Sequence, residues 1–216
     1  MARLEPSSAR ALAELILGYG LILVVLWTPE SAQRILSPIA FAVTLGIVLA
    51  GGQTREELGC GLRGLVPSLW ILPVALALTI ASAFLAKRAG TFHSLYDAHL
   101  GHVAGYFLWT IYQQFLLQDY FLPRMTRVLR NERKAVLLVA FLFATAHLPN
   151  LVLTAATFVW GLISCMLFRR YRNLYAIGLA QGLLGLCFAV SVPDALNHHM
   201  RVGLGYLHYR ATRPAP

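Results

Sequence analysis

Long apolar segments recur along almost the whole chain, and this pattern restricts the fold more than any other feature. Short loops that contain Pro, Gly or clusters of Arg separate these segments. Of the 216 residues, 58% are hydrophobic and only 12% are charged, against about 25% charged residues in an ordinary soluble domain. One soluble core of this size cannot hide so many apolar residues. The sequence therefore predicts an all-α, polytopic helical membrane protein.

The apolar segments predict a bundle of about seven transmembrane helices, or eight if one more segment crosses. The expected spans are residues 11–27, 35–50, 66–86, 102–122, 135–147, 151–168 and 173–192. Pro123 is expected to end the fourth span. Residues 53–65 are amphipathic and too short to cross, so they predict an interfacial helix or loop. We expect a single integral membrane domain over residues 1–216, with a polar and mobile tail over 194–216.

The basic residues predict how the chain is oriented in the membrane. Eighteen Lys and Arg residues oppose nine Asp and Glu residues, which gives a net charge of +9. Twelve of the basic residues fall at the N-terminus and in the second, fourth and sixth loops, and six fall on the other side. Because cytoplasmic loops collect Arg and Lys, the N-terminus is predicted to be cytoplasmic. No nucleic-acid-binding motif accompanies the charge, so we expect the lipid bilayer as partner and no nucleic acid.

Polar side chains within the predicted spans are the candidate functional residues, because they are costly at membrane depth. The fourth span contains the run YQQFLLQDYFLPR, the fifth ends in FATAHLPN, and the seventh contains LYAIGLAQGLLG. Residues four apart share a helix face, as Gln114 and Gln118 do. Three helices therefore each offer a polar group that is able to meet the others in one cavity. These groups are Gln113, Gln114, Gln118, His147 and Gln181.

The order and spacing of these motifs resemble those of the CAAX prenyl protease and bacteriocin-processing family. This family, also called CPBP or Abi, consists of glutamic-type intramembrane proteases with the motifs EExxxR, FxxxH and HxxxN. In this chain Gln113–Gln118 occupy the first motif, Phe143 and His147 match the second fully, and Gln181–Gly185 occupy the third. The resemblance covers roughly residues 105–190. It implies a CPBP-type fold in a plasma membrane, which we expect to be prokaryotic.

The resemblance implies a membrane-embedded endopeptidase that acts on a peptide or prenylated substrate without a metal or other cofactor. In the family, one glutamate of the pair activates a water, and histidines polarise the substrate or hold the oxyanion. Here neutral glutamines replace both glutamates, and a neutral amide has no useful proton affinity near pH 7. The positions carried over are Gln113, Gln114, Gln118, His147 and Gln181 for catalysis, and Phe143 and Asn150 for substrate binding.

Three interpretations of the polar residues follow. In the first, the protein is an active peptidase with altered chemistry, in which His147 acts as the base and Asp119 supplies a carboxylate. In the second, it is a pseudo-protease that binds a peptide or an isoprenoid-like lipid within the bilayer. In the third, the glutamines only form hydrogen bonds between helices, which contribute roughly 0.6–2 kcal/mol each.

Other polar and aromatic residues have simpler interpretations. His93, His99 and His102, with Asp97 among them, have a spacing that suggests a metal cluster, but solvated interfacial histidines are the favoured interpretation. Glu14, near the start of the first span, is expected to reach the interface or a polar partner. The four tryptophans fit, in several cases, the aromatic belts at the membrane surfaces. They are Trp27, Trp70, Trp109 and Trp160.

Overall fold

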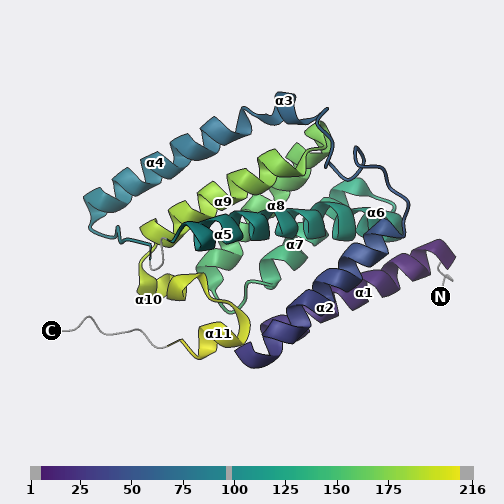
Figure 1. Ribbon diagram of the computed structural model, residues 1–216, viewed down its shortest axis with the longest axis horizontal. Coiled ribbons are helices and arrows are strands. Elements are labelled where there is room, and N and C mark those ends of the chain that lie inside the picture. Colours follow the sequence, from purple (N-terminus) through teal and green to yellow (C-terminus); the bar gives the residue numbers. More distant parts are fainter. Residues whose placement is uncertain (1–5, 96–98, 210–216) are drawn as a thin grey trace.

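The computed structural model describes residues 6–95 and 99–209, and within these residues all regular structure is helical (Figure 1). This result confirms the all-α prediction. The elements are α1 Pro6–Leu26, α2 Glu30–Leu49, α3 Leu65–Ser68, α4 Ile71–Ala89, α5 Leu100–Phe115, the π-helix η1 Leu116–Phe121, α6 Leu122–Leu129, α7 Glu132–Thr145, α8 Leu151–Tyr171, α9 Leu174–Ser191, α10 Asp194–Asn197, the 3₁₀-helix η2 His198–Met200 and α11 Gly203–Leu207.

Five helical segments are long and apolar enough to cross a membrane, so the protein is an integral membrane protein. These segments are Ser7–Leu26, Glu30–Leu49, Leu65–Ala89, Leu151–Tyr171 and Leu174–Ser191. The sequence also predicted crossings by the segments that form α5 and α7. Those helices contain 16 and 14 residues, fewer than the roughly 20 that a perpendicular span needs.

The fourth predicted span does not end at Pro123, as the sequence analysis expected. The helical backbone passes from α5 through η1 into α6 and ends only at Leu129, where Arg130 adopts a left-handed conformation with φ of 51°. Pro123 lies in the first turn of α6, where the missing N–H of proline costs little because helix N-termini leave such groups unpaired anyway. The proline therefore marks a change of helix type and not an end.

Helices α7, α8 and α9 each begin at an asparagine that caps the N-terminus. The side-chain oxygens of Asn131, Asn150 and Asn173 accept hydrogen bonds from backbone N–H groups three residues later, at 3.0, 3.1 and 2.9 Å. Each cap satisfies one of the donors that a helix start leaves unpaired. Asparagine thus sets the starting points of α7 and α9, where the second and third motifs lie, and of α8 between them.

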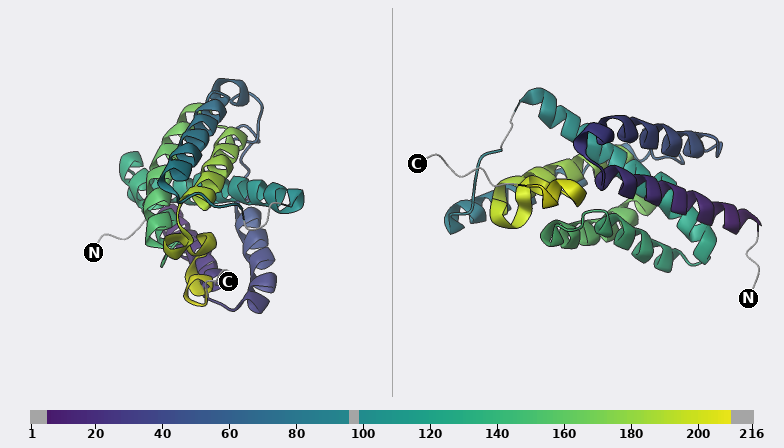
Figure 2. Two further views of the ribbon diagram at one scale, coloured as in Figure 1. Left: turned by 90° about the vertical axis from the view of Figure 1, so that its left-hand side faces the viewer. Right: turned by 90° about the horizontal axis from the view of Figure 1, so that it is seen from below.

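Helix α9 lies in the middle of the bundle, packed against α4 on one side and α5 on the other (Figures 1 and 2). Glycines make the close approach of α5 possible. A Cβ atom added at Gly178 would lie 2.6 Å from Ile111 Cγ1, and one at Gly182 would lie 2.3 Å from Phe107 Cδ1. Thr110 Oγ1 also donates to the carbonyl oxygen of Gly178 at 2.9 Å. Small residues and interhelical hydrogen bonds are the usual basis of helix association in membranes.

Helix α1 is joined to α6 by a polar contact that satisfies Glu14, as the sequence analysis expected. Arg124 Nε donates to Glu14 Oε2 at 2.7 Å, and Arg10 Nε donates to the other carboxylate oxygen at 2.8 Å. Tyr120 Oη donates to the backbone oxygen of Glu14 at 2.5 Å. The charged pair is only 9% and 15% exposed at its side chains, so it fixes how α1 sits against the helices that follow η1.

The N-terminal end of α1 and three of the basic connections lie at one end of the bundle (Figure 1). The loop between α2 and α3 contacts the turn after α8, since Arg172 Nη1 donates to the Glu57 carbonyl at 3.3 Å. Ser8 Oγ donates to the Arg127 carbonyl, also at 3.3 Å. Within the loop, the Thr54 N–H donates to the Glu57 carboxylate at 2.8 Å and holds the pKa of Glu57 below its ordinary value. Residues 53–64 form turns, so of the helix and the loop predicted for this segment the structure shows the loop.

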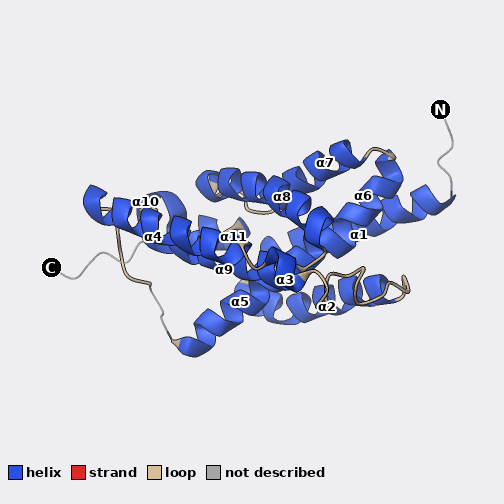
Figure 3. Cartoon of the chain, turned by 90° about the horizontal axis from the view of Figure 1, so that it is seen from above, coloured by secondary structure: helices blue, strands red, loops and turns tan. Residues whose placement is uncertain are grey.

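Residues 194–209 are folded, which corrects the prediction of a mobile tail for this part of the chain. They form α10, η2 and α11 and return to the bundle at the end opposite to the N-terminus (Figures 1 and 3). The Gly203 N–H donates to the Leu148 carbonyl at 2.8 Å. Residues 210–216 of the predicted tail, and Arg3 and Asp97, lie outside the described residues.

Candidate functional site

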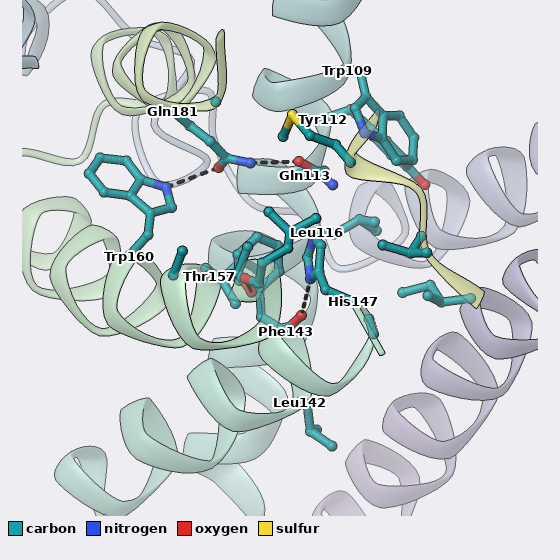
Figure 4. Close-up of a pocket in the computed structure, with 18 of the residues that line it drawn as sticks. Trp109, Tyr112, Gln113, Leu116, Leu142, Phe143, His147, Thr157, Trp160 and Gln181 are labelled. Atoms are coloured by element: carbon teal, nitrogen blue, oxygen red, sulfur yellow. Dashed lines mark hydrogen bonds between the residues drawn. The ribbon is translucent and has the colours of Figure 1, made fainter. Parts of the chain in front are cut away.

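The four glutamines singled out from the sequence form one continuous chain of hydrogen bonds, here called the glutamine network. Gln118 Nε2 donates to Gln114 Oε1 at 3.0 Å, and Gln114 Nε2 donates to Gln181 Oε1 at 2.5 Å. Gln181 Nε2 then donates to Gln113 Oε1 at 2.5 Å (Figure 4). The network joins α5 and η1 to α9, so the structure brings the first and third motifs together.

The network includes a residue that the sequence analysis did not place in the site. Trp160, in the middle of α8, donates from its indole Nε1 to Gln181 Oε1 at 3.1 Å (Figure 4). The sequence analysis had grouped Trp160 with the tryptophans of the aromatic belts. Its position, nine residues into a 21-residue span, is the signal against that assignment, since belt residues lie near the ends of spans.

His147 approaches from the opposite wall, at the end of α7. Its Nδ1 lies 2.7 Å from the carbonyl oxygen of Phe143, one turn earlier, and the two rings meet edge to face at 5.0 Å. His147 lies in the turn that follows α7, where its backbone N–H donates to the Ala144 carbonyl at 2.8 Å, and this turn keeps the imidazole beside Phe143. Because a carbonyl oxygen only accepts, Nδ1 carries the proton in this contact.

Gln113, Gln181, Phe143, His147 and Trp160 line a single cavity of about 500 Å³. The cavity lies between α1, α2, α5, η1, α7, α8 and α9, and most of its wall is aromatic or aliphatic. Gln114 and Gln118 do not line it. They are 0% and 1% exposed and lie behind the wall, where they support the residues in front. Of the predicted catalytic residues, Gln113, His147 and Gln181 thus form part of the cavity wall, and Gln114 and Gln118 form a buried layer behind it.

None of the described residues that line the cavity is an aspartate or a glutamate. Asp119, which the sequence analysis considered as a source of a carboxylate, is 1% exposed and lies outside the cavity wall. Neither Asp119 Oδ2 nor Gln118 Oε1 has a hydrogen-bond partner among the described residues. Both belong to η1, and π-helical turns often occur at functional sites. Here the turn buries the carboxylate instead of presenting it.

Gly185, at the position where the sequence predicts the last residue of the third motif, faces a tyrosine. A Cβ atom at this position would lie 1.9 Å from the hydroxyl oxygen of Tyr106 on α5. The Tyr106 hydroxyl therefore occupies the space that any side chain at position 185 would need.

Asn150, predicted to bind substrate, does not line the cavity. It is fully buried and caps α8, while its Nδ2 donates to the backbone oxygen of Asn197 at 2.8 Å and that of Arg201 at 3.3 Å. These bonds hold the C-terminal segment, whose residues Met200 and Val202 form part of the cavity wall. Asn150 therefore acts on the cavity through the segment that it holds.

The histidines near the start of α5 do not form a metal centre in the described part of the chain. No three His, Cys, Asp or Glu side chains are placed there to hold a metal ion. His93 Nε2 instead lies 3.0 Å from the Val192 carbonyl oxygen, and the rings of His99 and His102 lie 6.3 Å apart. These residues connect the loop to the end of α9 and pack against each other.

Comparison with family models gives one match, to the type II CAAX prenyl endopeptidase Rce1-like family, over residues 9–187. The chain belongs to the Rce1-like family. The match confirms the resemblance drawn from the three motifs and extends it toward the N-terminus, to α1 and α2. No curated protein and no solved structure matches the chain.

At the positions that the sequence predicts for the family's motifs, this protein has Phe143, His147 and the amides of the glutamine network. The geometry accounts for how these amides are stable at membrane depth. Gln118, Gln114 and Gln181 each donate to the next glutamine, so the network satisfies most of its polar atoms without any charge. The Rce1-like fold is therefore retained around an uncharged site.

Proposed function

We propose that this Rce1-like protein is a pseudo-protease that binds an isoprenoid-like lipid chain in its membrane cavity and does not hydrolyse peptide bonds. The supporting observation is the cavity wall, which carries no carboxylate among the described residues and presents amides that are bonded to each other. Peptide hydrolysis by the family's route needs a carboxylate to take a proton from water, and an amide cannot replace it.

The shape and lining of the cavity favour an apolar ligand. Its volume of about 500 Å³ falls within the range of about 300–1,000 Å³ that is common for ligand pockets. Aromatic and aliphatic side chains from α1, α5, α8 and α9 form most of the wall. Trp109 and Val159 on this wall are 48% and 55% exposed, so the cavity is not sealed. We propose that the lipid enters from the bilayer.

Hydrolysis with His147 as base is a second candidate, because one observation favours it. His147 Nε2 has no hydrogen-bond partner in the described part of the chain, and the side chain lines the cavity. An imidazole in this position is able to accept a proton from a bound water. This candidate predicts measurable cleavage that is lost in His147→Ala.

We also propose that α5–η1–α6 and α7 cross the membrane with the five longer segments, which gives seven crossings. The continuous helical run Leu100–Leu129 supports this, because 30 residues exceed the length that one span requires. With the basic loops at the same end as the start of α1, the N-terminus is then cytoplasmic. The protein is proposed to lie in the plasma membrane.

The proposed function is tested with purified protein in proteoliposomes. A farnesylated CAAX peptide is expected to remain intact, and a photoreactive farnesyl analogue is expected to label residues of the cavity wall. Leu184→Trp, which fills the cavity, should reduce labelling by at least fivefold. Leu78→Trp, the same change on the 53% exposed surface of α4, should leave it unchanged.

Three results would contradict the proposal. Cleavage of the peptide that His147→Ala abolishes would support the peptidase candidate. An absence of cavity labelling would remove the lipid as a ligand. Displacement of the probe by an unprenylated peptide, but not by an isoprenoid, would identify the ligand as a peptide.

A further inference from the structure

Trp160 determines the direction in which the glutamine network donates. An indole N–H can only donate, so the Gln181 atom that faces Trp160 Nε1 at 3.1 Å must be the amide oxygen. The amide nitrogen of Gln181 then points the other way, toward Gln113 Oε1 at 2.5 Å. In this orientation the Gln113 side-chain oxygen already accepts a hydrogen bond from Gln181.

Gln113 is left with its amide nitrogen free to bind a ligand. This nitrogen carries two N–H donors, and no residue in the described part of the chain accepts from it. Figure 4 shows it on the side of the amide that is turned away from Gln181. Because Gln113 lines the cavity, the network presents a hydrogen-bond donor to whatever binds there.

His147 presents the complementary group. Its Nδ1–H donates to the Phe143 carbonyl at 2.7 Å, so in the neutral imidazole Nε2 is an acceptor. Several other polar groups of the wall already have partners: Tyr19 Oη lies 2.8 Å from Thr145 Oγ1, Tyr112 Oη lies 3.1 Å from Thr44 Oγ1, and Thr157 donates to the Leu153 carbonyl at 2.8 Å. Ser37, Tyr106 and Trp109 are further polar residues of the wall. On the two facing walls that Figure 4 shows, Gln113 Nε2 is an unpaired donor and His147 Nε2 is an unpaired acceptor among the described residues.

Building on the proposed function, we propose that the ligand is an uncharged lipid alcohol, whose hydroxyl accepts from Gln113 Nε2 and donates to His147 Nε2. A hydroxyl combines one donor with two acceptor lone pairs on a single atom. An ether or ester oxygen accepts only, which leaves His147 unpaired. An ionised carboxylate brings a charge to a wall on which the described residues include no Lys or Arg, and burying an unpaired charge is costly.

The test compares ligands that share one 15-carbon chain and differ only in the head group. Binding of farnesol, farnesyl methyl ether and farnesoic acid to the protein in nanodiscs is measured by displacement of a radiolabelled isoprenoid at pH 8. Farnesol is expected to bind about tenfold more tightly than the ether. The alcohol donates a buried hydrogen bond to His147 Nε2, whereas the ether leaves this nitrogen without a donor. Farnesoic acid is expected to bind more weakly than farnesol.

A variant shows whether the preference arises at the proposed contact. His147→Leu should lower the ratio of alcohol affinity to ether affinity to about one, while the affinity for the ether changes by less than about twofold. Leu78→Met, a control on the exposed surface of α4, should retain the preference of the unmodified protein. A change in folding alone would weaken both ligands equally, so the ratio distinguishes loss of the contact from loss of structure.

Equal binding of farnesol and its ether to the unmodified protein would overturn the proposed alcohol while leaving lipid binding intact. A preference that survives His147→Leu would do the same. The tightest binding by farnesoic acid would point to an anionic head group and also overturn the proposal. If none of the three displaces the probe, the proposed function itself fails.

Discussion

At the scale of single residues, the site depends on the difference between an amide and a carboxylate. Gln114 lies at the centre of the network, where it accepts from Gln118 and donates to Gln181. A carboxylate at this position has the same size but no donor. Because the side chain is fully buried, water cannot replace the lost bond. The two neighbours of Gln114 in the network therefore require an amide at this position.

We expect Gln114→Glu to destabilise the protein by about 1–3 kcal/mol, the cost of an unmade buried hydrogen bond, and to produce no peptide cleavage. Gln118 also remains an amide, so the change restores a carboxylate without the arginine of the family motif. The free energy of unfolding in detergent and cleavage of a farnesylated peptide are the measurements. Gln53→Glu, the same change in the loop after α2, is the control and should be nearly neutral. An unchanged free energy of unfolding for Gln114→Glu would show that the glutamine network does not contribute significantly to the stability of the protein.

At the scale of elements, two features of the helices shape the cavity. The π-helical turn η1 continues the backbone past Pro123 and buries Gln118 and Asp119. The glycines of α9 let α5 approach closely, which brings Gln113 within hydrogen-bonding distance of Gln181. At Gly185 this contact is tightest, because the Tyr106 hydroxyl fills the space beside the glycine Cα.

Gly185→Ala is expected to separate α5 from α9, because its Cβ would lie 1.9 Å from Tyr106 Oη. Overpacking of this kind costs about 1–3 kcal/mol. Tyr106→Phe removes the clashing oxygen and should recover most of this stability in the double variant. Gly46→Ala, where a Cβ would meet no atom within 4 Å, serves as the control. Thermal unfolding in detergent is measured for the unmodified protein, the two single variants, their double variant and Gly46→Ala. Additive effects at positions 185 and 106 would contradict the proposed contact.

At the scale of the whole molecule, the ends of the bundle differ in charge and in contacts. One end contains the start of α1, the loop before α3, and the turns that follow α6 and α8 (Figure 1). The other end carries the C-terminal segment, which Asn150 holds against the bundle. The basic connections thus lie at one end of the bundle and the C-terminal segment lies at the other. This arrangement agrees with the positive-inside pattern of the sequence.

Cysteine labelling in cells tests the crossing by α5–η1–α6. In a background without Cys60, Cys165 and Cys187, a membrane-impermeant maleimide is expected to label His102→Cys in intact cells. Arg133→Cys is expected to react only after the cells are opened, because α5–η1–α6 places it at the other end of the bundle. Arg55→Cys, in the loop before α3, is the control and should behave like Arg133→Cys. Labelling of positions 102 and 133 from the same side would show that the segment does not cross.

The sequence by itself determined that this protein lies in a membrane, that it is helical and to which family it belongs. Apolar length and sparse charge require a membrane, and the spacing of three short motifs was enough to identify the Rce1-like relationship. These are properties of local pattern, which do not depend on where distant segments meet. The same local pattern was misleading at Pro123 and in residues 194–209, where neighbouring helices decided the conformation.

Only the tertiary structure decided which polar residues act together and in which direction they donate. Sequence spacing placed Gln113, Gln114 and Gln118 on one helix, but it did not separate the wall from the buried layer. Trp160 and Tyr106 carried no motif, and each matters because another helix brings it against Gln181 or Gly185. Hydrogen-bond direction is set by partners that lie far apart in the chain, and for this reason the chemistry of the cavity could not be derived from the sequence alone.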